Sequence, residues 1–373
     1  MHQEATIKIN GYKKIKILES LEETGWDNFV SSHPDGKIYH TSNWIKALEN
    51  ESGTKNVNLV CLDEEDKIEG IFPLLYTRGF PFGAGGLPGS KRLSSLPRTP
   101  LAGPLAYEDE IYNALIDKAV ELVKEDKDIK LQIKSLGESL TYSGEKFTSV
   151  AWRETYIYEI PPSGEEIRFG NSRNHSAIKR AVNKAERSGL TIRTVTSPKE
   201  LRQWYLMYLE TMAFHMTPAR SFSFFMDLWE KLAPQNLMRV DLAVLNDKEI
   251  LSGSIFFSFN DTVIYGFNGS RRDLFDFRPN DLLHWNAIHT AQKEGFKYYD
   301  MGEVQAEQEG LAAYKSKWCN LKRMIYHYYY PLEPENIEAS IDTAPSGKMK
   351  KTIWKKIPLP LTEVMGRFIY RYL

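Results

Sequence analysis

Residues 59–76, LVCLDEEDKIEGIFPLLY, and residues 242–259, LAVLNDKEILSGSIFFSF, share one pattern. Each stretch is an apolar run, a polar break and a second apolar run, which predicts a β-hairpin. An aromatic helical stretch precedes each hairpin. The alignment without a gap pairs Leu59 with Leu242, Leu62 with Leu245 and Gly70 with Gly253. We therefore expect a duplicated folding unit, and two such units side by side would leave a cleft of the kind that ligands occupy.

Length and composition limit the classes of protein that fit. The chain has 373 residues, enough for two domains, because single cores rarely grow far beyond ~250 residues. Its 48 basic and 49 acidic residues give a formal charge of −1, so no overall field attracts nucleic acid or membranes. Cys61 and Cys319 lie among apolar residues, which indicates buried thiols, and no metal-ligand spacing is present. A polar amino terminus and the lack of a long apolar run predict a cytoplasmic protein.

The order of predicted elements is the same in both halves of the chain. Helical patterns, a hairpin, a further helix and an extended run follow one another twice. Apolar spacing predicts a helix at 109–124 in the first half, and a helical pattern lies at 222–232 in the second. This order predicts an α/β (α+β) fold in which mixed, largely antiparallel sheets pack against helices. We place one domain at 1–160, a second at 161–335 and a tail at 336–373.

Two segments outside these elements stand out by composition. Residues 78–105 are rich in Gly and Pro and too long for a simple connector, so we expect this loop to contact a ligand. The tail interleaves lysines with Trp354, Phe368 and Tyr370, which suits the surface of an anionic membrane. A helix docked on the body of the protein, with solvated lysines, explains the tail equally well.

Three arginines precede the helix predicted at 280–294. Arg271, Arg272 and Arg278 would surround the N-terminus of this helix, for which Asn280 is a plausible N-cap. Unpaired N–H groups and guanidinium groups together would bind a phosphate or pyrophosphate. The alternative is a solvated loop in which the arginines pair with nearby aspartates.

Candidate catalytic residues follow this helix. Asp300 ends a predicted strand and Glu303 comes three residues later, so either carboxylate could accept a proton from an amine. Lys315 should return close to Asp300, where it could stabilise an oxyanion or form a structural salt bridge.

A basic helical stretch lies at 173–190, with Ser172 as a plausible N-cap and Gly189 as its stop. Its cations, among them Arg173 and Lys179, could bind tRNA or a nucleotide-linked substrate, and binding would then weaken with salt. A solvated helix face is the simpler explanation.

Five motifs carry a resemblance to a known family: HTSNW at 40–44, GLPGSKRLSSLPRTPLAGPL at 86–105, RNHSAIKRAVNKAERSGL at 173–190, RPNDLLHWNAI at 278–288 and YYDMGEVQAEQEGLAAYKSKW at 298–318. The chain resembles the FemAB family of aminoacyl and acyl transferases, whose fold is a tandem pair of GNAT-like units. It is most similar to the FemAB-like acyltransferases found beside cell-surface polysaccharide genes.

The resemblance implies acyl transfer to an amine in a ternary complex, without a covalent enzyme intermediate. It places Asp300 on the acidic position of the YDFG-like motif and Lys315 on the lysine of the FK-like motif, where Tyr314 replaces the usual Phe. The loop before the helix lacks the R/Q-x-x-G-x-G/A pattern, so the co-substrate is either acyl-CoA or aminoacyl-tRNA, neither tightly bound. The residues expected to bind substrate are Trp44, Arg173, Lys179, Tyr314 and Trp318.

We therefore expect an N-acyltransferase or aminoacyltransferase. Its acceptor would be an amine of a small-molecule, lipid-linked or nucleotide-linked precursor of the cell envelope or of a polysaccharide, with tRNA as a further candidate partner. The rival hypothesis is a non-catalytic protein that binds RNA or a membrane surface through the helix at 173–190 and the lysine-rich tail. An adaptor that keeps the fold without activity is the third.

Overall fold

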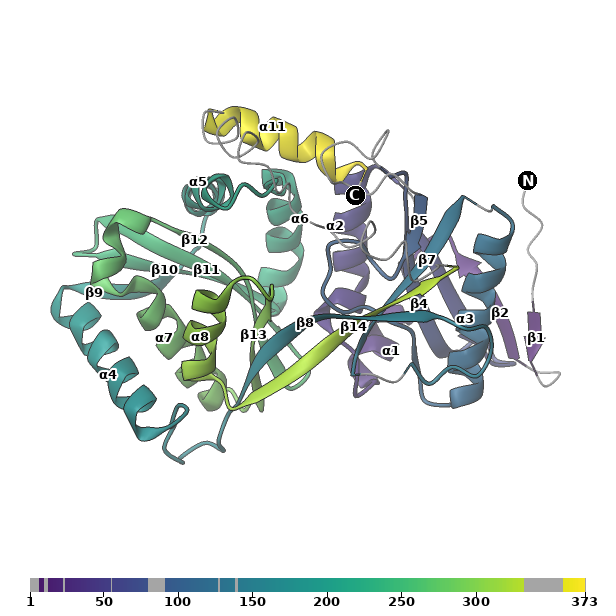
Figure 1. Cartoon of the computed structure of the whole chain (residues 1–373), viewed down its shortest axis with the longest axis horizontal. Coiled ribbons are helices and arrows are strands. Elements are labelled where there is room, and N and C mark those ends of the chain that lie inside the picture. Colours follow the sequence, from purple (N-terminus) through teal and green to yellow (C-terminus); the bar gives the residue numbers. More distant parts are fainter. Residues whose placement is uncertain are drawn as a thin grey trace. The chain divides into compact units, whose positions relative to one another are not determined.

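The computed structural model describes residues 7–9, 13–22, 24–54, 56–79, 91–126, 128–137, 140–331 and 358–372. Figure 1 shows the elements that they form. Contacts divide the chain into two compact units. Unit 1 holds the residues up to Trp152, the strand segment that begins at Met324 and the last residues from Phe368 on. Unit 2 holds Arg153–Arg323 and the described residues from 358 to Arg367. The chain therefore passes between the units inside strands, whereas the sequence suggested boundaries at 160 and 335.

Unit 1 is a mixed sheet with helices on both faces. Its strands are β1 (Ile7–Ile9), β2 (Lys13–Leu18), β3 (Asn56–Leu62), β4 (Ile68–Thr77), β5 (Lys91–Ser94), β6 (Leu105–Ala106), β7 (Ile129–Leu136) and β14 (Leu321–Tyr330). Its helices are α1 (Trp26–Ser32), the 3-10 helix η1 (Ile38–His40), α2 (Ser42–Ser52) and α3 (Asp109–Lys124). The strand order is β1-β2-β3-β4-β5-β7-β14, and only β5 and β7 run parallel among the pairs of this sheet.

Unit 2 repeats this arrangement. Its strands are β8 (Thr148–Glu159), β9 (Leu190–Thr194), β10 (Met238–Leu245), β11 (Glu249–Phe259), β12 (Thr262–Ser270) and β13 (Tyr298–Val304). Its helices are α4 (Ser172–Arg187), α5 (Pro198–Phe214), α6 (Phe222–Leu232), α7 (Pro279–Lys293) and α8 (Glu309–Trp318), with 3-10 turns at η3 (Ala233–Gln235) and η4 (Arg272–Phe277). The strand order is β9-β10-β11-β12-β13-β8, and β12 and β13 form the parallel pair.

The two units correspond strand by strand, which confirms the predicted tandem fold. In each unit a first strand and two helices lead into a hairpin, and a helix then connects the two parallel strands. The last strand of each sheet comes from a distant point in the sequence. Strand β14 follows the other strands of unit 2 in the sequence but pairs with β7, whereas β8 directly follows β7 in the sequence but pairs with β13.

The two hairpins match one residue away from the alignment that the sequence suggested. The bulge lies between Cys61 and Leu62 in unit 1, where Cys61 pairs with Gly70, and between Ala243 and Val244 in unit 2, where Ala243 pairs with Ser252. Gly70 therefore corresponds to Ser252 and not to Gly253. A one-residue slip moves each side chain to the opposite face of a sheet.

The surroundings of the two glycines confirm this correction. A Cβ on Gly70 would lie 2.6 Å from a side-chain carbon of Ile111 in α3. A Cβ on Gly253 would lie 2.7 Å from the indole of Trp204 in α5. Helices α3 and α7 occupy equivalent positions after the hairpin, whereas α5 precedes it, so the two glycines face opposite helix layers.

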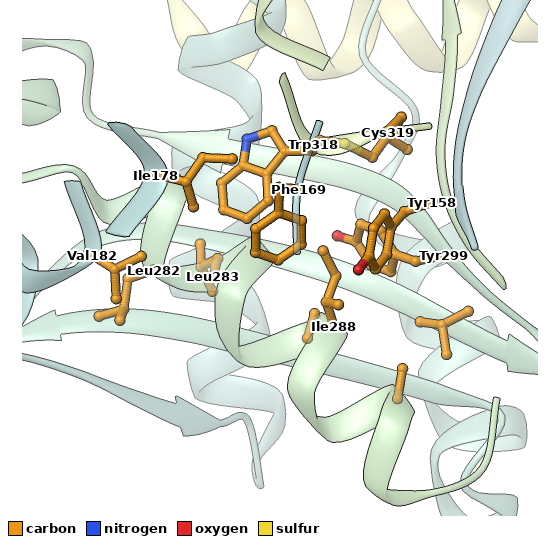
Figure 2. Packing of buried hydrophobic residues seen from close by; sticks show 14 of the residues in the cluster. Tyr158, Phe169, Ile178, Val182, Leu282, Leu283, Ile288, Tyr299, Trp318 and Cys319 are labelled. Atoms are coloured by element: carbon orange, nitrogen blue, oxygen red, sulfur yellow. The ribbon is translucent and has the colours of Figure 1, made fainter. Parts of the chain in front are cut away.

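The helices of unit 2 form two layers. Helices α5 and α6 pack on one face of the sheet, and α7 packs on the other with α4 and α8 beside it (Figure 1). Figure 2 shows the core beneath α4, α7 and α8, where Phe169, Ile178, Leu283, Tyr299 and Trp318 meet. Burial of this apolar surface provides the main stabilisation of the layer.

Helix limits follow local sequence with small differences. Helices α3 and α6 begin and end at the predicted residues. Helix α4 begins one residue earlier than the predicted cap implies, because the side chain of Asn171, and not that of Ser172, accepts a hydrogen bond from the N–H of Asn174. Gly189 follows the helix with φ of 82°, as its predicted role as a stop requires.

Two predicted segments lie partly outside the described residues. Residues 80–90 of the Gly/Pro-rich loop and residues 332–357, which include most of the predicted tail and Trp354, are not described. The end of the tail forms the helix α11 (Leu359–Tyr370). Over the described residues, no helix combines the length and apolarity that a membrane span requires.

Candidate active site

A cavity of about 360 Å³ lies in unit 2, where α4, the N-terminal end of α7 and α8 come together. Residues of α4 form one wall: Ala177, Ile178, Arg180, Ala181 and Lys184. Arg278 and Asp281 from the start of α7, and Tyr314, Lys317 and Trp318 from α8, form the rest. The volume is sufficient for a phosphate or pyrophosphate but not for a whole nucleotide cofactor.

Four cations and one carboxyl group line this cavity. Arg180, Lys184, Arg278 and Lys317 form no ion pair with any acidic side chain in the part of the chain that the structure describes. The positive end of the α7 dipole points to the same place. The cavity therefore has a local excess of positive charge that the near-zero net charge of the chain conceals.

The inner wall of the cavity holds polar atoms without partners. The side chain of Trp318 is fully buried, and its Nε1 lies near the Tyr314 hydroxyl but makes no hydrogen bond of good geometry with the described residues. The Tyr314 hydroxyl lies beside the Asp281 carboxyl but makes no hydrogen bond of good geometry. Buried donors without partners are rare and costly, so these two groups point to an acceptor that occupies the cavity in the working protein.

Asp281 is the one acid in the cavity. Burial raises the pKa of its carboxyl group, and the nearby charges of Arg278 and Lys317 oppose this increase. A carboxyl with a raised pKa is protonated more readily, and a protonated carboxyl does not repel an anion.

His284 supports the aromatic wall from beneath. It lies one turn after Asp281 on α7, and its ring centroid lies 5.9 Å from that of Tyr314 and 5.5 Å from that of Trp318. Its Nδ1 is 2.7 Å from the hydroxyl of Tyr299. Burial lowers the pKa of His284 to about 3, so the imidazole is neutral and acts as a packing and hydrogen-bonding group.

Strand β13, on the other side of α8, carries the predicted catalytic acids at a bulge. Asp300 pairs with Ile157 and Glu303 pairs with Thr155, so two residues of β13 lie opposite one residue of β8. Gly302 adopts φ of 77°, which glycine reaches without strain, and thereby permits the bulge. The parallel pairing with β12 ends at Asp300, although β12 continues to Ser270 and β13 to Val304.

Lys315 holds this bulge in place. Its Nζ donates hydrogen bonds to the carbonyl oxygens of Met301, Gly302 and Glu303, at 2.6, 3.1 and 3.2 Å. Its side chain is buried, and desolvation lowers its pKa to about 8. An ammonium group has three protons to donate, and all three are used by the backbone here. The nearby charge of Asp300 opposes this lowering of the Lys315 pKa.

Asp300 and Glu303 are held differently. Asp300 Oδ1 accepts hydrogen bonds from the Thr155 hydroxyl and from the N–H of Gly302, both at 2.7 Å. Glu303 forms an ion pair of 2.6 Å with Arg153. Both carboxylates are half-buried; Glu303 pairs with Arg153, and the charge of Asp300 acts on the buried ammonium group of Lys315.

The structure does not bring the three predicted arginines together at the α7 N-terminus. Arg278 lines the cavity, but Arg271 pairs with Glu249 and Asp273, as the alternative interpretation allowed in part. Arg272 stacks on the ring of Phe214, with its Cζ 3.6 Å from the ring centroid.

Asn280 is not the N-cap, and that expectation was wrong. Arg278, in the left-handed region with φ of 62°, occupies the capping position, and the helix begins at Pro279. The Asn280 side-chain oxygen instead accepts hydrogen bonds from the hydroxyls of Ser252 and Ser270. This contact fastens the start of α7 to strands β11 and β12.

The remaining predicted substrate residues lie in different places. Tyr314 and Trp318 line the cavity, whereas Arg173 and Lys179 are exposed on α4 and do not line it. Trp44 is buried in unit 1, where its Nε1 donates to the Thr99 hydroxyl at 3.1 Å. Its indole is therefore a core group in this structure.

Sequence reasoning did not select Asp281 and Lys317, and it treated Arg180 and Lys184 only as members of the basic helical stretch. The spacing of Arg180 and Lys184, four residues apart and flanked by half-buried Ala177 and Ala181, was the available signal. Over the described residues, no group of His, Cys, Asp and Glu side chains could hold a metal ion.

Residues 172–316 match the family model described as an acetyltransferase (GNAT) domain. A search of curated protein sequences gives no significant match. Among solved structures, FemX matches with a TM-score of 0.59 and 17% identity over 85% of this chain and 98% of FemX. L-PGS from Bacillus licheniformis matches with a TM-score of 0.53 and 12% identity over 81% of this chain and 96% of L-PGS. A conserved protein of unknown function from Bacteroides thetaiotaomicron matches with a TM-score of 0.55 and 12% identity over 84% of this chain and 99% of that protein.

These findings define the class of protein. Unit 2 contains a GNAT acetyltransferase domain, and the whole chain has the tandem GNAT fold. The predicted resemblance to the GNAT superfamily, with the FemAB-like fold of FemX, is thereby confirmed. The GNAT domain at residues 172–316 supports an acyltransferase.

Proposed function

We propose that this protein transfers an acyl group from an acyl-CoA to a primary amine, with the donor phosphates in the cavity of unit 2. The observation that carries this proposal is the unpaired positive charge of that cavity within a GNAT domain. GNAT domains use acyl-CoA, and a pyrophosphate matches both the volume and the charge of the site.

Two parts of the donor, its phosphates and its amide-containing arm, would have counterparts in unit 2. Arg180, Arg278 and Lys317 would contact the phosphate oxygens, and Trp318 Nε1 would donate to one of them. The amide-containing arm of the donor would lie along β12 beyond Ile264, where that strand no longer pairs with β13. An extended arm with amide groups can form hydrogen bonds to such an edge as an added strand does.

The chemical step is attack of the amine nitrogen on the thioester carbonyl carbon. The C–N bond forms, the C–S bond breaks, and CoA leaves as a thiolate that takes up the proton released by the amine. Asp300 accepts this proton from the amine before it reaches the sulfur. Lys315 acts as a positioning residue, because it fixes the backbone between Asp300 and Glu303.

The acceptor is proposed to be an amine on a precursor of the cell envelope or of a surface polysaccharide. FemX and L-PGS share the fold, and the notion of an envelope acceptor rests on that likeness and on the sequence motifs. Aminoacyl-tRNA remains the rival donor, since the cationic surface of α4 outside the cavity, with Arg173 and Lys179, would suit a longer polyanion.

Acyl transfer with the full-length protein tests the proposal. Acetyl-CoA and longer acyl-CoAs are supplied with amino sugars and short peptides, and free thiol and acylated amine are measured together. Equal release of thiol and product is expected. Transfer from aminoacyl-tRNA alone would replace the proposed donor. Salt-sensitive RNA binding without transfer from either donor would favour the non-catalytic alternative.

A further inference from the structure

Helix α11 presents an apolar stripe on its outer side. Leu361, Val364 and Phe368 are 52%, 63% and 53% exposed. Their spacing of three and four residues places them on one face of the helix. Exposed apolar residues on soluble proteins are usually scattered, so three in register on one helix mark an interaction surface.

The opposite side of α11, over its residues up to Arg367, is anchored to unit 2. Thr362 is buried, and a Cβ on Gly366 would lie 2.0 Å from the carbonyl oxygen of Ala219, so the helix backbone rests directly on that segment. Glu363 pairs with Arg202 of α5 at 3.2 Å. Because these contacts fix the inner side, Leu361 and Val364 face away from unit 2.

Two arginines lie close to the apolar stripe in α11. Arg367 and Arg371 are exposed within one to two turns of Val364 and Phe368. Glu363 is the only acidic residue from 358 to 373, and its carboxylate is turned inward to Arg202. The outer side of α11 therefore combines apolar and cationic groups, as in helices that lie in the interface of an anionic membrane.

The size of the stripe favours a lipid surface over a protein. Three half-exposed side chains offer roughly 300 Å² in total, if a large apolar side chain contributes ~200 Å² when fully buried. A stable protein partner requires about 800 Å² from each side. Insertion of a few side chains into a bilayer interface needs no such area, because anionic lipids add attraction for arginine.

We propose that α11 docks this protein on the surface of an anionic membrane through Leu361, Val364 and Phe368, with Arg367 and Arg371 at the lipid headgroups. The helix lies in the interface and does not cross the bilayer. This inference does not depend on the donor site of unit 2.

Vesicle binding by the full chain tests the inference. Co-sedimentation is measured with vesicles of phosphatidylglycerol and phosphatidylcholine in equal parts, and with phosphatidylcholine alone. The native protein should bind the anionic vesicles, and the triple variant L361N/V364N/F368N should bind them at least about tenfold more weakly. The single variant L311N, at an exposed leucine of α8, serves as control and should bind as the native protein does.

A second measurement keeps the test valid if the triple variant is unstable. Because Cys61 and Cys319 are buried, a Val364→Cys variant can be labelled there with an environment-sensitive dye. Its emission should shift to the blue with anionic vesicles, whereas a label at Leu311→Cys should not shift. Lack of vesicle binding by the native protein, or equal binding by the triple variant, would overturn the inference. A dimer in solution that the triple variant abolishes would also overturn it, because a second copy would then cover α11.

Discussion

Units 1 and 2 share a strand order but differ in charge at one equivalent position. Helix α3 follows the hairpin of unit 1 and begins with Glu108, Asp109 and Glu110. Helix α7 follows the hairpin of unit 2 and begins with Arg278, and its first turn faces three further cations across a cavity. A helix N-terminus attracts anions in both units, but acidic side chains occupy that position in unit 1. The duplicated fold supplies the same helix dipole twice, and the side chains at the start of the helix give the two copies opposite charge.

Charge reversal in the cavity should have the largest effect. The double variant R278E/K317E removes two cations from the cavity and adds two anions. The KM for the acyl-CoA donor should rise at least about 100-fold, because each charge-assisted hydrogen bond contributes about 1.5–3 kcal/mol. The measurement is steady-state kinetics over a range of donor concentrations.

The matched control is R173E/K179E, which makes the same change in net charge at exposed residues of α4 outside the cavity. Its KM for the donor should change by less than about threefold. Equal losses in the two variants would mean that overall charge, and not the cavity, attracts the donor.

The Asp300→Asn variant should have the second-largest effect. It should lower kcat by roughly 100-fold, because the amine loses its proton acceptor, while the KM for the donor stays close to the native value. Glu303→Gln is the comparison and should lower kcat much less, because the Glu303 carboxylate is paired with Arg153. A larger loss for Glu303→Gln than for Asp300→Asn would exchange the roles of the two acids.

Lys315→Met tests the bulge and compares two buried lysines. Lys134 of unit 1 donates to the carbonyls of Leu96 and Thr99, much as Lys315 does in unit 2. Both Lys→Met variants should lose about 2 kcal/mol of the free energy of unfolding. Only Lys315→Met should lower kcat as well, since Lys134 belongs to unit 1.

The pH dependence of stability follows from the pKa of Lys315. This pKa is lowered in the folded protein to about 8 from 10.5, so between these values the unfolded chain binds more protons than the folded one. The free energy of unfolding of the native protein should therefore rise with pH in this window, relative to Lys315→Met. Denaturant unfolding at several pH values measures the difference, and parallel pH profiles for the two proteins would contradict the burial of a charged Lys315.

Alanine at the two glycines sharpens the structural comparison. Gly70→Ala and Gly253→Ala should each cost about 1–3 kcal/mol of unfolding free energy, because a new methyl group meets Ile111 or Trp204. Ile111→Val should restore part of the stability of Gly70→Ala but none of that of Gly253→Ala. Rescue of both variants by Ile111→Val would place the two glycines against the same helix layer.

Asp281→Asn should have the smallest effect. Removal of the carboxyl group should tighten donor binding two- to fivefold above neutral pH, by roughly 0.5–1 kcal/mol, because the ionised form repels phosphate. Since burial raises the pKa of this carboxyl, native affinity should fall as pH rises through that pKa, and Asp281→Asn should lack this fall. Titration calorimetry at several pH values measures the donor affinity. The same pH dependence in the native protein and in Asp281→Asn would mean that Asp281 does not act on the bound donor.

Much of the fold could be predicted from the sequence. Apolar spacing located α3 and α6 to the residue, and the repeated apolar and polar runs located both hairpins. The register was wrong by one residue because an extra residue in a bulge leaves no mark in an apolar pattern. The exchange of β8 and β14 was also out of reach, because pairing between distant strands depends on tertiary contacts.

The candidate site was only partly predictable. Arg278, Tyr314 and Trp318 line the cavity as the motifs suggested, but Arg180 and Lys184 were hidden within a run of similar charges. Which cation of an exposed helix faces a cavity depends on how α4 packs against α7 and α8. The contacts of Lys315 were not predictable for a related reason. A lysine that donates hydrogen bonds to backbone carbonyls looks the same in sequence as one that binds a ligand.

A structure of the protein with acyl-CoA bound would show whether the cavity of unit 2 binds the donor phosphates. We expect the phosphate groups to lie in this cavity, at a hydrogen-bonding distance of about 3 Å from Arg180, Arg278 or Lys317. Phosphates bound at another place, above all beside the acidic N-terminus of α3, with the cavity left empty, would contradict it.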